Sequence, residues 1–409
     1  MPQLEEVTLD EVKHLVSNRA ITGETMLLNM GPQHPSTHGV LRLLLELDGE
    51  IIVNCIPDIG YLHTGVEKTM EAKTYQQAEV LSDRLDYLNP IGNNLAYCLA
   101  LEKILELDVP PRAQAIRVIM TELQRIASHL VWLGTQSLDL AAMSVFLYTF
   151  REREHVLDIF ELVSGQRMMT TYIRPGGLWR DVPVEFEDAV RQLIEYLPPR
   201  LDQYEGLLTK NPLYVDRTKR IGVISAEDAI AWGLTGPTLR GSGVAYDLRK
   251  AHPYSSYEQY DFDVPTETSG DVFGRYQVRM EEMNQSMRII KQALDKLPNG
   301  PVRSNNRKYI PPPRSELGTS MEALIHHFKL WTEGFDVPKG YVYFPVESPR
   351  GELGVYLESD GSNKPYRAHW RTPSFIHLQA LPIMVKGLLV ADLVAIIGSI
   401  DIVLGDADR

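Results

Sequence analysis

The stretch "AIRVIMTELQRIASHLVWL", residues 115–133, carries the pattern that decides the fold class of this chain. Its apolar residues recur every three or four positions, at Ile116, Ile119, Leu123, Ile126, Leu130 and Leu133. This spacing places them on one face of an α-helix. Pro110 and Pro111 precede the pattern, where proline suits the first turn of a helix. We therefore predict a long helix with one buried face.

Further helices are predicted on both sides of this stretch. The segment 66–88 is rich in helix formers and ends at Asn89-Pro90, because the residue before a proline avoids the α conformation. A second helix is predicted at about 91–106. Residues 138–150 are apolar nearly all round, which predicts a helix buried on every side. Later helices are predicted at about 184–208, 266–297 and 318–333.

Strands are predicted near the two ends of the chain. Residues 40–60 read as a β-hairpin around Asp48-Gly49, a strong two-residue turn signal. Residues 341–361 again read as strand, turn and strand. The apolar tract 387–405 is interrupted by Asp392 and Asp401, so a buried core helix is favoured over a membrane span. This order predicts one α+β domain over residues 1–409. Its parts are a β region at 22–65, a helical core at 66–335, and a β region with a tail at 336–409.

Composition limits the classes of function. The chain has 409 residues and a formal net charge of -13, which disfavours nucleic-acid binding through phosphates. Only two cysteines occur, Cys55 and Cys98, so neither a disulfide framework nor an iron–sulfur cluster with four thiolates from this chain is possible. The first sixteen residues are acidic and lack an apolar core, which predicts no signal peptide.

The stretch "GPQHPSTHGV", residues 31–40, is a candidate site with two histidines. His34 and His38 have the spacing of metal ligands on a helix, but Pro35 and the flanking glycines disfavour a helix there. One alternative is a turn whose polar side chains bond its own backbone. The other is a rigid loop that presents a histidine to a ligand, with little entropy to lose on binding. The residues alone leave both open.

Two further titratable residues stand in unusual places. Asp139 lies in an apolar run, where a carboxylate must be hydrogen-bonded or is costly to keep charged. It either caps the start of a helix or orients another side chain. Tyr87 falls in the last turn of the helix predicted at 66–88, where a core tyrosine is the simple alternative to a functional one.

Four longer stretches resemble one protein family. They are "GPQHPSTHGVLRL", "YLHTGVEKTMEAKTY", "MMTTYIRPGG" and "VESPRGELGVYLESDGSNKPYR". Together they resemble the hydrogenase-like large subunit of respiratory complex I, the NADH–quinone oxidoreductase, known as the D-type or 49 kDa-type subunit. The resemblance runs from about residue 22 to the end. It implies a fold like that of nickel–iron hydrogenase large subunits, with a central bundle of long helices and peripheral β-hairpins in the N- and C-terminal parts.

The metal ligands of those hydrogenases are missing from this chain. The first cysteine pair of the hydrogenases aligns with Asp86 and Asn89, and the second with Val403 and Asp406. Nickel and iron in such sites need soft thiolate ligands. The resemblance therefore implies a hydrogenase scaffold without metals, in which this chain binds no cofactor.

The resemblance also implies a quinone site in the vacated place. His38 and Tyr87 match the family residues that bond the two quinone carbonyls, and Val403 matches a segment that lines the pocket. Asp139 matches the carboxylate that orients the histidine. Hydrogen-bond donors aimed at both oxygens would stabilise the charge that reduction places there.

The implied assembly has several partners and a defined place. Electrons would come from an iron–sulfur cluster on a neighbouring subunit, and the quinone would arrive through a membrane-embedded subunit. A neighbouring subunit of the hydrophilic arm is also implied. The chain would lie peripherally on the cytoplasmic face of a bacterial inner membrane, and reduction would be coupled to proton translocation. Two alternatives are a subunit of a membrane-bound hydrogenase-type complex and a purely structural scaffold.

Overall fold

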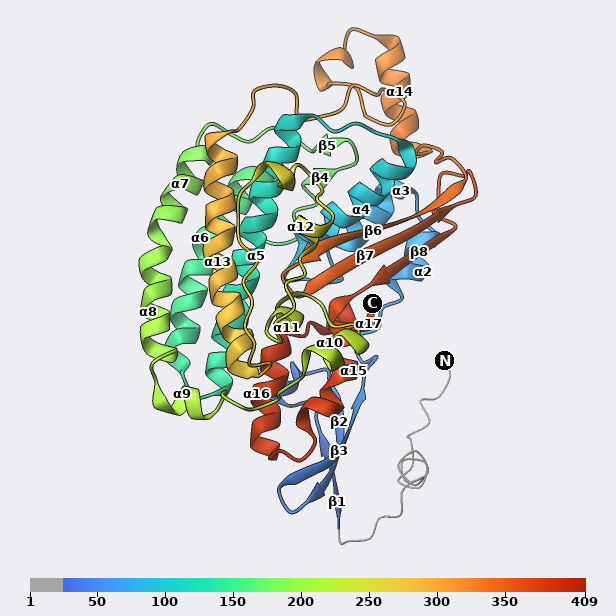
Figure 1. Ribbon diagram of the computed structural model, residues 1–409. Helices are drawn as coiled ribbons and strands as arrows, with labels where there is room; N and C mark the ends of the chain where they lie inside the picture. The colour runs from blue at the N-terminus through green and yellow to red at the C-terminus, as the bar shows by residue number, and fades with distance from the viewer. Residues whose placement is uncertain (1–24) are drawn as a thin grey trace.

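The computed structural model describes residues 25–409 of the chain. Long helices lie side by side on one side of the molecule, and a C-terminal sheet lies beside them (Figure 1). The N-terminal strands lie below that sheet in the same view, and α14 lies at the opposite end (Figure 1). The predicted absence of a signal peptide, and residues 22–24 of the predicted β region, lie outside the described residues.

The helices, in chain order, begin with two short ones before the long core helices. They are α2 (Val66–Glu71), α3 (Tyr75–Ser82), α4 (Pro90–Leu105), α5 (Pro111–Asp139), α6 (Met143–Ser164), α7 (Phe186–Tyr196), α8 (Pro198–Leu208), α9 (Pro212–Asp216), α10 (Ala226–Ala231), α11 (Gly236–Arg240), α12 (Leu248–Ala251), α13 (Val272–Asp295), α14 (Met321–Thr332), α15 (Pro373–Val385), α16 (Val390–Ile400) and α17 (Leu404–Asp408). Short 3-10 helices are η1 (Pro35–Thr37), η2 (Tyr257–Gln259) and η3 (Arg314–Glu316). The mixed helix and strand content predicted from the sequence is confirmed.

The strands form antiparallel sheets. They are β1 (Met26–Met30), β2 (Arg42–Asp48), β3 (Ile51–Asp58), β4 (Ile173–Arg174), β5 (Gly177–Leu178), β6 (Gly340–Ser348), β7 (Gly351–Ser359) and β8 (Arg367–Arg371). They pair in the orders β1-β2-β3, β4-β5 and β6-β7-β8. Both predicted hairpins are confirmed. Gly49 takes a left-handed φ of 62° in the first turn, which glycine adopts without strain.

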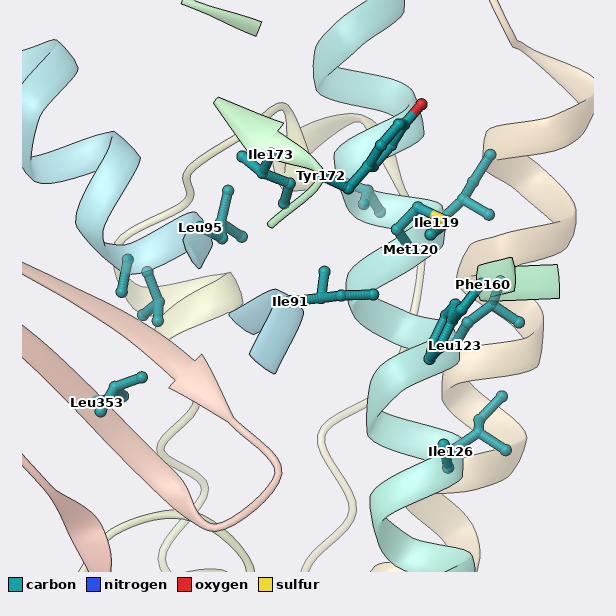
Figure 2. Packing of buried hydrophobic residues seen from close by; sticks show 14 of the residues in the cluster. Ile91, Leu95, Ile119, Met120, Leu123, Ile126, Phe160, Tyr172, Ile173 and Leu353 are labelled. Atoms are coloured by element: carbon teal, nitrogen blue, oxygen red, sulfur yellow. The ribbon is translucent and has the colours of Figure 1, made fainter. Parts of the chain in front are cut away.

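The long helix predicted from residues 115–133 is confirmed as the centre of the core. All of its periodic apolar side chains are buried, and α5 packs against α6 and α13. Figure 2 shows Ile119, Leu123 and Ile126 along α5 with Phe160 of α6 close by. Burying such a stripe is the main source of stability for a helix in a protein.

The single helix predicted over residues 66–88 is wrong. The structure has α2 and α3 instead, because Thr74 caps a new helix by accepting a hydrogen bond from the Gln77 N–H. Helix α3 ends at Ser82, and Tyr87 lies in the turns that lead to α4. The helix predicted at 184–208 is likewise two helices, α7 and α8, which meet before Pro198.

The helix predicted over residues 138–150, buried on every side, is also wrong. Helix α5 ends at Asp139, the chain turns through Ala141 with a φ of 67°, and α6 begins at Met143. Leu138 and Met143 are exposed. The apolar composition could not distinguish a buried helix from a helix break with apolar residues at the surface.

The apolar tract 387–405 contains α16 and the start of α17, so the predicted core helix is confirmed. In the described part of the chain, no helix is both long and apolar enough to cross a membrane.

Candidate functional site

The loop of residues 31–40 uses its first histidine to build its own turn. The His34 Nδ1 accepts a hydrogen bond from the Ser36 N–H at 3.3 Å, at the start of η1. The Thr37 hydroxyl donates to the carbonyls of Pro32 and His34, at 3.2 and 3.0 Å. His38 ends the turn in a left-handed conformation, and its side chain is exposed. His34 therefore supports the turn, as the first alternative holds, and the presentation of His38 to a ligand stays a prediction.

His38 is accessible and yet closely surrounded by protein. Its pKa is lowered, chiefly because the surrounding protein displaces water; the Asp401 carboxylate raises this pKa, and the Arg350 guanidinium lowers it. The imidazole is therefore neutral near pH 7, with one N–H to donate and one nitrogen to accept.

Tyr87 lies in the same electrostatic surroundings as His38. Its pKa is raised by burial, and Arg350 and Asp401 act on it with opposite signs, as they do on His38. The ring packs against Gly405 of α17, where an added Cβ would lie 3.2 Å from a ring carbon. His38 and Tyr87 are 49 positions apart in the sequence. They nevertheless have the same two charged neighbours, Arg350 and Asp401.

Val403 lies directly before α17, two residues from Gly405. Its side chain is buried, and its backbone N–H donates to the Ser374 hydroxyl at 3.2 Å. Two residues later Gly405 touches the Tyr87 ring. The structure therefore brings Val403, Tyr87 and the charged neighbours of His38 into one region.

Asp139 lies at the C-terminal end of α5 and faces the opening loop. The Ser36 hydroxyl donates to its Oδ1 at 3.5 Å, the outer limit for a hydrogen bond. Burial raises the pKa of Asp139, and His34 lowers it. Asp139 is thus hydrogen-bonded to Ser36 and acted on by the charge of His34, and its pairing with His38 stays a prediction.

Arg350 is the central residue that the sequence motifs did not reveal. It is fully buried between β6 and β7, and its Nη1 donates to Asp86 Oδ2 at 2.7 Å. The same nitrogen donates to the Ser128 hydroxyl at 3.1 Å, and Nη2 donates to Asp401 Oδ1 at 3.3 Å. The only signal for it was its place in the "PRGE" part of one family-like stretch.

Asp406 completes this group. It is 1% exposed, and its Oδ2 accepts a hydrogen bond from the Ser374 N–H at 3.0 Å, while its Oδ1 has no hydrogen-bond partner. Burial, reinforced by the carboxylate of Asp86, raises the pKa of Asp406 to about 7. We call Arg350, Asp86, Asp401 and Asp406 the Arg350 cluster.

The donor set does not suit a metal. Among residues 25–409, no three His, Cys, Asp or Glu side chains are arranged to hold a metal ion. Cys55 and Cys98 are buried, and burial raises the pKa of both thiols. Two hollows of about 560 and 910 Å³ lie elsewhere, between α6 and α7 and beside residues 301–316.

Comparison with known proteins identifies the family. A family model described as the 49 kDa subunit of respiratory-chain NADH dehydrogenase matches residues 139–409. One of the D-type NADH-quinone oxidoreductase chains of Chloroflexus aurantiacus is 63% identical over 389 residues, 94% of this chain and 95% of that protein. A D-type chain of Roseiflexus castenholzii is 64% identical, over 94% of this chain and 93% of that protein. The chain belongs to this family. The predicted resemblance to the D-type subunit of complex I is thereby confirmed, and the chain is a component of the NADH–quinone oxidoreductase.

Proposed function

We propose that this D-type subunit provides the quinone-reduction site of complex I, with His38 and Tyr87 as donors to the two quinone carbonyls. One observation carries the proposal: these two residues, from separate segments, share Arg350 and Asp401 as charged neighbours. The carbonyls of a quinone lie on opposite edges of one ring, so donors from separate segments can hold it. Val403 would line the same site.

Both donors are in the protonation state that the proposal needs. Burial raises the pKa of Tyr87, so its hydroxyl keeps its proton and donates a hydrogen bond. The neutral His38 ring donates through an N–H. Two-electron reduction places negative charge on both oxygens, and donors aimed there stabilise it. The same charge raises the pKa of His38, which favours uptake of a proton from water to form an imidazolium, and the imidazolium passes this proton to the quinone oxygen.

Asp139 would act on His38 through the opening loop. The Ser36 contact joins the carboxylate to η1, which ends at His38. A carboxylate at the C-terminal end of a helix is disfavoured by the helix dipole, and burial adds to this cost. A change of charge at His38 would therefore displace Asp139 readily, and this displacement would couple quinone reduction to proton translocation.

The proposal includes the rest of the assembly. An iron–sulfur cluster on a neighbouring subunit would supply the electrons, since this chain has too few cysteines for a four-thiolate site. A membrane-embedded subunit would deliver the quinone, and another subunit of the hydrophilic arm would flank this chain. We further propose one domain with a hydrogenase-like fold, placed peripherally on the cytoplasmic face of the bacterial inner membrane.

Tyr87→Phe and His38→Ala in the intact complex test the proposal. We expect each to lower NADH–quinone activity at least tenfold, the scale of a lost acid–base group, while NADH–ferricyanide activity is kept. Tyr366→Phe and His252→Ala, at exposed positions, are matched controls that should keep both activities. Unchanged quinone reduction in both test variants, with the complex assembled, would leave only a scaffold role.

A further inference from the structure

We propose that the Arg350 cluster stores a proton and that Asp406 passes it to Tyr87 when the quinone is reduced. This inference rests on the proposed function, because it concerns the source of one proton at the same site. It assigns Asp406 as a positioning and proton-supplying residue that acts through Tyr87.

The arrangement of charges favours a stored proton. Three carboxylates, those of Asp86, Asp401 and Asp406, are buried around Arg350. The guanidinium of Arg279 also interacts electrostatically with Asp401. Burial lowers the pKa of Arg279 to about 10, so Arg279 is still charged at pH 7. One negative charge is therefore in excess. An uncompensated buried charge is costly, and one bound proton removes it.

The hydrogen bonds indicate where this proton sits. Arg350 donates to Asp86 and to Oδ1 of Asp401, so both carboxylates have a cationic partner at hydrogen-bond distance, although Oδ2 of Asp401 is buried without a partner. Asp406 has only the Ser374 N–H on Oδ2, and its Oδ1 is buried without a partner. A bare buried carboxylate oxygen loses its hydration without compensation, whereas a carboxylic acid does so at less cost.

The charged and polar groups that face Asp406 come from three elements. They are Asp86 from the segment before α4, Arg350 from the β6–β7 turn, and the polar Ser374 from α15. The neighbours of Asp406 on α17 point elsewhere: Asp408 accepts from the N–H groups of Gly60 and Leu62. The raised pKa of Asp406 agrees with the geometry.

Asp406 lies one residue from a contact between α17 and the Tyr87 ring. It follows Gly405, whose α carbon faces the Tyr87 ring, and Tyr87 itself follows Asp86 in the sequence. Arg350 acts on both residues. A tyrosine that has given up its proton is a phenolate, a strong base because the ordinary pKa of tyrosine is about 10, so a nearby carboxylic acid can restore its proton.

Electrons and protons balance in this step. The quinone takes two electrons from the iron–sulfur donor, the Tyr87 O–H bond breaks, and its proton bonds to one reduced quinone oxygen. The other oxygen takes its proton through His38, as in the proposed function. The O–H bond of Asp406 then breaks, its proton restores the tyrosine hydroxyl, and Asp406 is left as a carboxylate. Water supplies its next proton. No residue of this chain is oxidised or reduced.

Asp406→Asn in the intact complex tests the inference, because asparagine keeps an acceptor for the Ser374 N–H but cannot supply a proton. Wild-type quinone reduction should fall as pH rises through about 7, where Asp406 loses its proton. The variant should be at least tenfold slower with a flat profile over this range, and ferricyanide reduction should be normal. Asp406→Glu should restore part of the quinone-reduction rate and part of its pH dependence. Asp392→Asn, a mostly buried helix-cap carboxylate on α16, is the matched control and should behave as wild type.

Infrared difference spectroscopy of the same complex supplies a second readout. We expect the carbonyl band of a protonated carboxylic acid to change on reduction, and to be lost in Asp406→Asn. If the asparagine variant does not assemble, a shifted band in Asp406→Glu supports the inference and an unshifted one overturns it. Wild-type activity and pH profile in Asp406→Asn, with Tyr87→Phe impaired, would overturn this inference alone. Normal activity in Tyr87→Phe and His38→Ala would instead overturn the proposed function.

Discussion

Arg350 Nη1 lies 2.7 Å from Asp86 Oδ2, although the two residues are 264 positions apart in the chain. Loss of this guanidinium would leave the buried carboxylates of Asp86 and Asp401 without the cation that donates to them. We expect Arg350→Met to lower the free energy of unfolding by about 3–5 kcal/mol. Urea unfolding of the purified complex, followed by hydrogen exchange in α5 and β7, measures this. Arg367→Met is the matched control, because Arg367 is a partly exposed ion-pair residue whose loss should cost about 1 kcal/mol or less. Equal effects of the two variants would contradict the prediction.

Gly405→Ala should disturb Tyr87 directly. The added Cβ would lie 2.5 Å from the Leu85 carbonyl oxygen and 3.2 Å from the Tyr87 ring, so the turn that carries Tyr87 must shift. We expect a severalfold rise in KM for quinone with ferricyanide reduction unchanged, measured by steady-state kinetics. Gly206→Ala on α8, where no atom lies within 4 Å of the added Cβ, should leave KM unchanged. A normal KM in Gly405→Ala would place the quinone away from Tyr87.

Asp139→Asn should separate quinone reduction from proton translocation. The variant keeps an acceptor for Ser36 but removes the charge that we propose to be displaced. We expect the ratio of protons translocated to electrons transferred to fall at least twofold, while electron transfer is partly kept. The measurement is proton uptake by vesicles during NADH oxidation. Asp158→Asn, at an exposed position on α6, serves as the control. An unchanged ratio in Asp139→Asn would exclude Asp139 as the coupling residue.

Glu79 on α3 gives the stability of the fold a predictable pH dependence. Burial raises its pKa from 4.5 to about 8, with Arg174 opposing, so the folded protein favours the protonated acid. Stability from this group is complete below pH 4.5 and falls as pH rises to about 8. Glu79→Gln does not titrate, so it should gain stability relative to wild type as pH rises. Thermal unfolding of the complex at about pH 5 and about pH 8 measures this. Glu154→Gln, at the surface, should show no such trend.

Helix α14 presents a row of apolar side chains that the described part of the chain leaves uncovered. Phe328 and Trp331 are 66% and 63% exposed, and Met321, Leu324 and Ile325 continue the row. Exposed apolar patches mark sites that bind a protein, a membrane or a ligand, and we expect α14 to contact another subunit. We expect the double variant Phe328→Ser/Trp331→Ser to keep its fold but to lower the yield of assembled complex severalfold on native gels. Leu213→Ser, a single exposed apolar residue on α9, should assemble normally. Normal assembly of the double variant would show that α14 contacts no partner.

The sequence predicted correctly those helices and strands that are determined by hydrophobic periodicity or by turn residues. The period of Ile116 to Leu133 gave α5, and Asp48-Gly49 gave the first hairpin. The break before α3 depends on one cap, Thr74, inside a run of helix formers, and composition does not reveal it. The break after Asp139 was hidden because apolar residues at a surface read like those of a core.

The site residues were predicted through the family resemblance and not through periodicity. His38, Tyr87, Val403 and Asp139 come from separate segments, and no pattern within one segment links them. Arg350 was missed because its importance arises from partners near residues 86 and 401, which only the folded chain brings together. The residues next to Arg350 in the sequence indicate a turn, but they do not reveal that Asp86 and Asp401 lie beside it.

The Arg350 cluster also limits when the N-terminal part of the chain can complete its folding during synthesis. Asp86 emerges from the ribosome long before Arg350 and Asp401 are synthesised. Domains of nascent chains fold from the N-terminus onward as they emerge. A buried ion network that is half complete is less favourable than none. The segment that contains Tyr87 therefore cannot reach its final packing before Arg350 and Asp401 are present. Contacts of such long sequence separation also form slowly. The N-terminal half therefore completes its packing only after residues 350 and 401 have been synthesised, and we expect the nascent chain to bind chaperones until then.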